Sequence, residues 1–186
     1  GWATAVTVVQ INGAVSLNRR PTTAANTAAT IAQKAGGQVI LLPSPAILER
    51  LETKQAIESD RTVAGVIELA AGASAYLFRG GGADRTSALV ESGYLSGTDV
   101  TELRRKGAIG DVVGRFIDAN GNIVDPGLDE RTMGLSLEQL RAAANAIFVV
   151  SGEAKHPVAR AVVTSGLCTV IVTDEATALA LLEENA

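Results

Sequence analysis

The sequence has few of the residues that carry most metal and nucleophile chemistry. Its 186 residues include one cysteine and one histidine, and aromatic residues make up only 3% of the chain. Cys168 has no partner for an internal disulfide, and its apolar setting in GLCTVIV is typical of a small buried residue. His156 precedes Pro157 at the start of a predicted helix, which favours a solvated cap over a general base. A zinc site would need carboxylates from distant positions, so we expect no metal and no cofactor.

The sequence also lacks an excess of positive charge and any long uncharged apolar run. Lysine and arginine number 16 against 20 aspartates and glutamates, a formal net charge of −4. This balance leaves no basic field to hold a phosphate backbone, so direct DNA binding by this chain is not expected. Charged residues interrupt the apolar segments, and no signal-peptide pattern is seen, so we expect no transmembrane helix and a cytoplasmic location.

What the sequence does contain is an alternation of strand-like and helix-like segments. The length suits one domain, and 47% of the residues are hydrophobic. Predicted strands cover residues 6–11, 38–42, 73–78, 112–118, 146–150 and 168–172. Predicted helices cover residues 22–35, 47–69 (in two pieces), 98–106, 137–144, 157–165 and a last segment after residue 174. The alternation predicts an α/β fold with a Rossmann-like, doubly wound, mostly parallel sheet.

Two glycine-containing stretches modify this pattern. Asn120-Gly121 is the strongest short hairpin signal, and residues 123–124 are expected to return antiparallel to the strand over 112–118. The run Gly80-Gly81-Gly82 follows the strand over 73–78 and permits backbone conformations that other residues resist. We expect a small antiparallel hairpin at the first stretch and a loop that a ligand can approach at the second.

Ligands of such sheets bind beyond the carboxyl ends of the strands, which selects the glycine run at residues 80–82 and two further groups of residues. Gln10, Asn12 and Gly13 follow the first strand. Gly152 and Lys155, in SGEAK, follow the strand over 146–150. A glycine turn into a helix offers free N–H groups and partial positive charge, and a lysine adds a full cation, so a phosphate would suit it. The alternative is an ordinary capped turn with a solvated lysine.

Seven segments occur in an order that suggests a family. They are VVQINGAV, LLPSPAIL, SGYLS, GAIGDVVGRFIDANGNIVD, GLSLEQLR, SGEAK and VIVTDEATALALL. This series resembles the sugar-binding (effector) domain of SorC-family bacterial transcriptional regulators, the group that includes DeoR- and CggR-like repressors. The resemblance covers nearly the whole chain. It implies a fold similar to glucosamine-6-phosphate deaminase and ribose-5-phosphate isomerase, and an allosteric sensor in which a phosphorylated sugar controls how the regulator's oligomer binds operator DNA.

The resemblance also implies which residues bind the ligand. The matched positions are Gln10, Asn12, Gly13, Asp111, Gly152 and Lys155. Amide side chains can donate to and accept from sugar hydroxyls, and the carboxylate of Asp111 can accept from them. Lys155 is implied to contact the phosphate.

The sequence departs from the family in three places. Ser151 stands where the family has glycine, and FRGGGAD replaces a more apolar turn. Within that stretch Arg79 is either a ligand contact or a surface charge. No segment matches the family's N-terminal helix-turn-helix or its first strand. We therefore expect residues 1–186 to form one effector-binding domain that lacks those parts, assembles as a homo-oligomer, and reaches DNA only through the helix-turn-helix domain.

The sequence is also compatible with two other functions. An isomerase- or deaminase-like enzyme of the same fold could use Asp111 or Glu153 as a base, with Lys155 as a second proton carrier. An oligomerisation module that binds no ligand is the other alternative. Consumption of a substrate would identify the enzyme, and a concentration-dependent dimer without any ligand response would identify the module.

Overall fold

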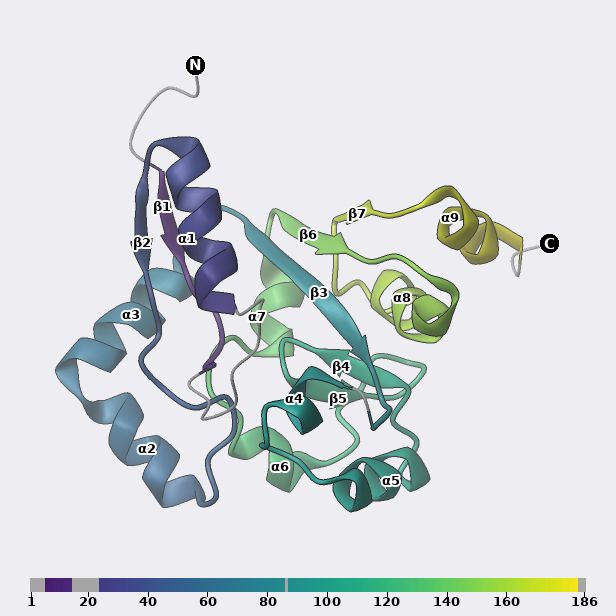
Figure 1. Cartoon of the computed structure of the whole chain (residues 1–186), viewed down its shortest axis with the longest axis horizontal. Coiled ribbons are helices and arrows are strands. Elements are labelled where there is room, and N and C mark those ends of the chain that lie inside the picture. The colour runs from purple at the N-terminus through teal and green to yellow at the C-terminus, as the bar shows by residue number, and fades with distance from the viewer. Residues whose placement is uncertain (1–5, 15–23, 86, 184–186) are drawn as a thin grey trace. The chain divides into compact units, whose positions relative to one another are not determined.

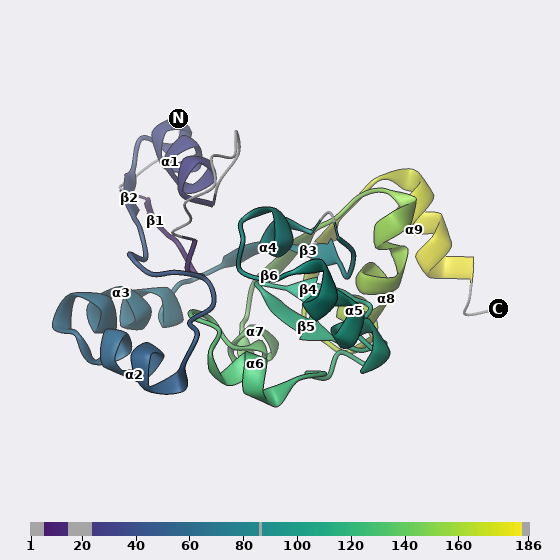
Figure 2. The same cartoon turned by 60° about the horizontal axis from the view of Figure 1, so that its bottom comes forward.

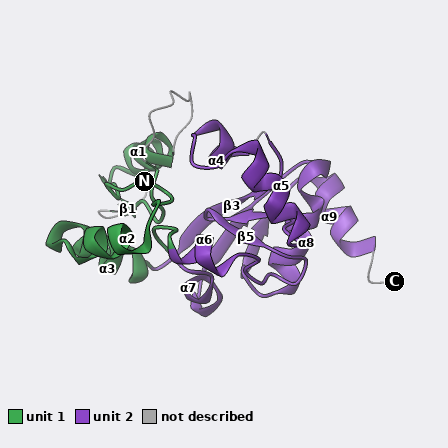
Figure 3. Cartoon of the chain, turned by 90° about the horizontal axis from the view of Figure 1, so that it is seen from below, with its two compact units in different colours: residues 1–73, 131–135 green, residues 74–130, 136–186 purple. Residues whose placement is uncertain are grey.

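The chain forms two compact units, coloured separately in Figure 3. The computed structural model describes residues 6–14, 24–85 and 87–183. Unit 1 consists of Gly1–Ala73 with Arg131–Leu135, and unit 2 consists of Ser74–Glu130 with Ser136–Ala186. Each unit combines strands with helices, so the predicted α/β class is confirmed at that level.

Unit 1 contains a small parallel sheet. Its elements are β1 (Thr7–Val9), α1 (Ala24–Ala35), β2 (Gln38–Ile40), α2 (Leu51–Ser59) and α3 (Arg61–Ala71). β1 and β2 are parallel neighbours, and α1, which lies between them in sequence, packs against both (Figure 1). The predicted strands over 6–11 and 38–42 are present but shorter. The helix predicted over 22–35 is also present, with residues 22 and 23 outside the described part of the chain.

Asp60 separates α2 from α3. Its carboxylate accepts hydrogen bonds from the backbone N–H groups of Thr62, at 2.9 Å, and Val63, at 3.4 Å. Such a cap satisfies donors that the first helical turn leaves unpaired and stabilises a helix by about 1 kcal/mol. The prediction of a helix in two pieces is confirmed, although α2 begins at Leu51 rather than at residue 47.

The short segment Arg131–Leu135 belongs to unit 1 although it is distant in sequence. The N–H of Leu135 donates to the carbonyl of Ile11 at 2.9 Å. Met133 is only 1% exposed and lies in an apolar cluster. The other buried members of this cluster are Leu42, Leu48 and Val63. No sequence pattern predicted this long-range pairing.

Unit 2 is built on a five-stranded mixed sheet (Figure 2). In spatial order its strands are β5 (Arg115–Ile117), β4 (Gly110–Val112), β3 (Tyr76–Gly82), β6 (Ala146–Val149) and β7 (Val170–Val172). β3, β6 and β7 are parallel, whereas β4 and β5 are antiparallel to their neighbours. The expected antiparallel appendage is therefore part of the sheet, attached along the far half of β3.

Several helices of unit 2 begin at side-chain caps. The helices of this unit are α4 (Ala88–Glu91), α5 (Gly97–Arg105), α6 (Pro126–Glu130), α7 (Leu137–Ala142), the 3-10 turn η1 (Glu153–Lys155), α8 (His156–Thr164) and α9 (Glu175–Leu182). Ser96 and Ser136 each form a capping box with the residue three positions later, and Asp174 caps α9. α8 packs against β3 and β4, which places its apolar side against one face of the sheet.

The strand predicted over residues 112–118 is wrong, because a tight turn divides it. Val113 and Gly114 both have positive φ, 49° and 86°, and they join β4 to β5 as a two-residue hairpin. A β-branched residue at positive φ is an outlier, and no turn preference predicts it. The expected turn at Asn120-Gly121 is present, since Ile117 and Ile123 form an antiparallel bridge across it.

The glycine run after Phe78 is part of a strand, so the predicted loop is also wrong. A Cβ on Gly80 would lie 3.1 Å from Cγ2 of Val158 in α8. A Cβ on Gly81, which faces the other way, would lie 2.2 Å from Oδ1 of Asp111. The glycines therefore make room for a closely packed helix on one face of β3 and for a carboxylate on the other.

Apart from Arg79, the sheet face that carries Asp111 is mainly apolar and exposed. Every second residue along β3, β6 and β7 lies on this face, because residues that pair in register across neighbouring strands point to the same side of the sheet. Those with the largest exposed fractions are Leu77 (53%), Val149 (42%), Val170 (46%) and Val172 (52%). Within the described ranges, no helix combines the length and the apolar character needed to cross a membrane.

Candidate functional site

Asp111 is the most unusual ionisable residue that the structure describes. It pairs with Gly81 in the β3–β4 ladder, and its Oδ2 accepts the N–H of Gly114 at 3.1 Å. Burial raises the pKa of Asp111 to about 6, although the Gly114 hydrogen bond and the positive charges of Arg79 and Lys155 act in the opposite direction. A carboxyl group with this pKa is poised to change its charge near neutral pH, which is common in functional sites.

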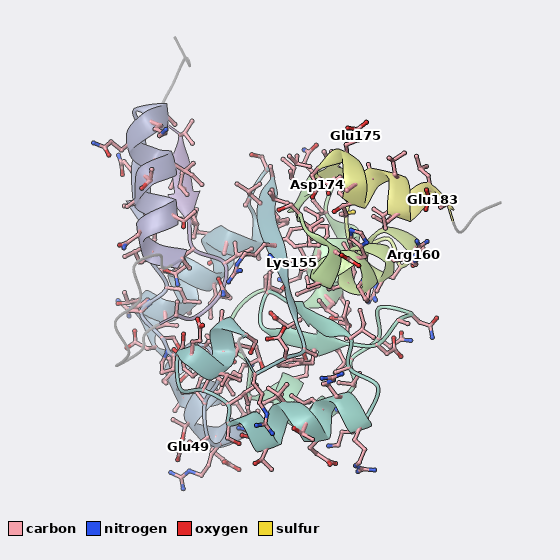
Figure 4. All side chains as sticks on the ribbon, turned by 45° about the vertical axis from the view of Figure 1, so that its right-hand side comes forward. Glu49, Lys155, Arg160, Asp174, Glu175 and Glu183 are labelled. Atoms are coloured by element: carbon pink, nitrogen blue, oxygen red, sulfur yellow. The ribbon has the colours of Figure 1, made fainter. Side chains whose placement is uncertain are left out.

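Arg79 and Lys155 supply positive charge to the same place from two elements. Arg79 is an exposed residue of β3, and Lys155 is a half-buried residue at the end of η1, labelled in Figure 4. β3 and η1 lie against one another. Among the described residues, neither side chain forms a hydrogen bond or a salt bridge. Two cations close to Asp111 thus retain their capacity to bind an anion.

The turn at Gly152 forms as predicted, but its amide is already used. Gly152 has a φ of 95°, and its N–H donates to Oδ2 of Asp174 at 3.0 Å. The other oxygen of Asp174 accepts the N–H of Thr177, and these bonds lower the pKa of Asp174. A phosphate in this region would therefore depend on the Lys155 side chain more than on the Gly152 amide.

His156 is not a solvated cap, contrary to the sequence-based expectation. Its Nε2 lies 3.2 Å from Oγ1 of Thr177, a fully buried residue of α9. The Thr177 hydroxyl donates to Oδ2 of Asp174 at 2.9 Å. This chain of contacts connects the start of α8 to the start of α9. The motif Asp-x-x-Thr at residues 174–177 is the sequence signal that could have indicated it, since Thr at that distance from a capping Asp lies within reach of it.

The remaining predicted ligand residues lie in unit 1. Gln10 is 6% exposed, and its Nε2 donates to the carbonyl of Asn12 at 2.6 Å. Asn12 forms a bridge with Gly134, and a Cβ on Gly13 would lie 2.0 Å from the carbonyl oxygen of Pro45. These contacts give all three residues a role in the packing of unit 1. Ligand binding by Gln10, Asn12 and Gly13 stays a prediction.

Other candidate chemistry is weak in the part of the chain that the structure describes. Desolvation raises the pKa of the half-buried Cys168 thiol, which keeps it protonated and a poor nucleophile. No cluster of three or more metal-ligating side chains occurs among the described residues. The cluster of Arg79, Asp111 and Lys155 is therefore the strongest candidate in unit 2. It can accept hydroxyl hydrogen bonds at Asp111 and bind an anion at the two cations.

A known family model matches nearly the whole chain. Residues 3–183 match the family model described as "Putative sugar-binding domain". The chain is 31% identical over 179 residues to the deoxyribonucleoside regulator of Bacillus subtilis (strain 168), covering 96% of this chain and 57% of that protein. It is also 30% identical over 152 residues to the erythritol catabolism regulatory protein EryD of Brucella abortus (strain 2308), covering 82% and 48%. The chain thus spans about half the length of these regulators.

Solved structures agree with this assignment. A domain of a possible sugar-binding transcriptional regulator from Arthrobacter aurescens TC1 is 33% identical, with a TM-score of 0.80, and the match covers 95% of this chain and 68% of that one. The full-length sorbitol operon regulator SorC from Klebsiella pneumoniae has a TM-score of 0.85 at 22% identity, over 95% of this chain and 57% of that one. The second likeness shows a shared fold.

Proposed function

The chain belongs to the family of sugar-binding domains found in DeoR- and SorC-type transcriptional regulators, and from that premise we propose that it senses a phosphorylated sugar. The relatives are regulators rather than enzymes, and the chain is accordingly a sensor domain without turnover. One observation carries the proposal: Asp111 is faced by Arg79 and Lys155. The carboxylate suits sugar hydroxyls, and the cations suit a phosphate.

The relatives are longer than this chain, which supports a proposal about the regulator as a whole. We propose that effector binding changes how the whole regulator holds operator DNA, that a separate helix-turn-helix domain contacts the DNA, and that the regulator acts as a cytoplasmic homo-oligomer. We also propose that the complete domain has a Rossmann-like, doubly wound sheet similar to that of glucosamine-6-phosphate deaminase and ribose-5-phosphate isomerase. The parallel strands β3, β6 and β7, separated by helices, support this arrangement.

A thermal-shift panel of sugar phosphates, with each unphosphorylated sugar as its control, tests the proposal. A ligand that binds only the folded state at one hundred times its Kd stabilises that state by about 2.7 kcal/mol. We expect one or a few phosphorylated sugars to raise the Tm while their parent sugars do not. The Lys155→Ala variant should lose that rise while keeping its own Tm. Equal shifts with phosphorylated and parent sugars would contradict a phosphate requirement.

An oligomerisation module without a ligand is the second candidate, and the exposed apolar sheet face favours it. Leu77, Val149, Val170 and Val172 expose 42–53% of their surface, which is typical of a face that packs against another molecule. Sedimentation velocity across a concentration series would detect such a dimer. A concentration-dependent dimer that responds to no sugar phosphate would support this candidate over the sensor.

A further inference from the structure

We infer that Arg79 is a specificity-determining residue of the unit 2 site, where its guanidinium binds the same phosphoryl group of the effector as Lys155. This inference rests on the proposed function and deepens it. Sequence alone leaves Arg79 undecided between a ligand contact and a surface charge.

The register of the sheet places Arg79 beside Asp111. Arg79 precedes Gly81 by two residues, so both point to the same face of β3. Gly81 is directly opposite Asp111 on β4, and the space where its Cβ would be is occupied by the Asp111 carboxylate. Arg79 is therefore a diagonal neighbour of Asp111 across two adjacent strands, within reach of a long side chain.

No contact within the described part of the chain explains why an arginine stands at position 79. On this face its neighbours along the strand and across it, Leu77 and Val149, are apolar. No described carboxylate lies within salt-bridge distance of its guanidinium, although Asp111 is close enough to feel its charge. An exposed arginine with an unused five-donor fork beside a half-buried carboxylate is arranged for an external anion.

The charge balance favours a phosphoryl group as that anion. A phosphate monoester carries a charge of about −1.5 to −2 near pH 7, and its oxygens accept the two parallel bonds of a guanidinium. Lys155 alone offers one positive charge, and the nearby Gly152 amide donates to Asp174 instead. A second cation would supply the positive charge that the Gly152 turn does not provide. Arg79 is suited to this role because it lies on the same face of the sheet as Asp111.

Binding of inorganic phosphate to the 186-residue chain, followed by backbone amide NMR shifts at pH 7.5, tests the inference. The variants are Arg79→Gln, Lys155→Gln and the double variant, with Arg104→Gln as the control. Arg104 is an exposed arginine of α5 in the same unit. We expect each site variant to weaken phosphate binding about fivefold or more, the double variant to lose less than the product of the two, and Arg104→Gln to bind as the unaltered chain does.

The outcomes separate this inference from the proposed function. If Lys155→Gln weakens binding while Arg79→Gln titrates like the control, the phosphate site stands and the role of Arg79 is overturned. If phosphate does not bind, or binds both variants unchanged, the proposed function fails as well. Arg79→Lys keeps the charge but loses the fork, so it should bind between the unaltered chain and Arg79→Gln. The Tm of each variant checks that the fold is retained.

Discussion

At the residue scale, the proposed site is built around Asp111. The sequence identified it through the family resemblance, but its burial against Gly81 could not be predicted, because that depends on which residues two strands place opposite each other. The same pairing explains why burial and the neighbouring positive charges have opposite effects on the pKa of Asp111. The sheet holds a carboxylate where burial disfavours its charge, and the two cations that partly compensate for this are those an anionic ligand would use.

Because burial disfavours the charge of Asp111, we predict that Asp111→Asn stabilises the chain at pH 7.5. The pKa of Asp111 is about 6 in the folded protein, against 3.8 ordinarily, so between these values the folded state binds more protons than the unfolded state. Stability therefore falls as the pH rises from about 4 to about 6 and stays lower above that. The variant avoids this loss, which is at most about 3 kcal/mol. Urea denaturation should show a gain at pH 7.5 that disappears below about pH 4.

Asp118→Asn is the matched control, and it should change stability in the opposite direction. Asp118 accepts the N–H groups of Asn120 and Asn122, at 2.8 and 2.9 Å, and these bonds lower its pKa. The stability it contributes is present above its unfolded pKa and is lost as the pH falls through the lower folded value. If both variants lost stability equally at pH 7.5, the burial of Asp111 would be misjudged.

At the element scale, the sequence predicted which segments form strands and helices better than where they turn. The apolar patterns identified β6, β7 and α8 closely. In β6 and α8 the pattern reflects burial against neighbours, whereas Val170 and Val172 of β7 are about half exposed. Apolar periodicity failed at Val113-Gly114, where packing and the Asp111 hydrogen bond hold a valine at positive φ. It failed again at Gly80-Gly81-Gly82, because the use of glycine there depends on Val158 and Asp111, which are distant in sequence.

The close packing of α8 predicts that Gly110→Ala is strongly destabilising. An added Cβ would lie 2.4 Å from the carbonyl oxygen of Gly81 and 2.8 Å from Cβ of Val158, so backbone must move. We expect a loss of about 3 kcal/mol in urea denaturation. Gly97→Ala, in the same unit, has only the flexible Arg85 side chain nearby, at 3.4 Å, and should change stability by less than about 0.5 kcal/mol. Equal losses would show that β3, β4 and α8 are packed less closely than described.

At the scale of the whole molecule, the chain matches about half the length of its relatives, and its net charge is negative. Its formal net charge is −4, and it spans 57% of the deoxyribonucleoside regulator and 57% of the SorC chain. We predict that micromolar concentrations of this chain do not bind duplex DNA at physiological salt, because nonspecific affinity comes from neutralised phosphates. Fluorescence anisotropy with a labelled duplex measures this. Binding that weakens steeply with added salt would contradict it and locate a DNA contact within these residues.

A crystal structure of the chain with the sugar phosphate that gives the largest thermal shift tests the central claim most directly. We predict that the phosphoryl group lies within hydrogen-bond distance of Lys155 Nζ and the Arg79 guanidinium, with a sugar hydroxyl donating to Asp111. A sugar phosphate bound away from all three residues would contradict the proposed site, even if it raised the Tm. A phosphate contacted by Lys155 but not by Arg79 would retain the sensor and remove only the role inferred for Arg79.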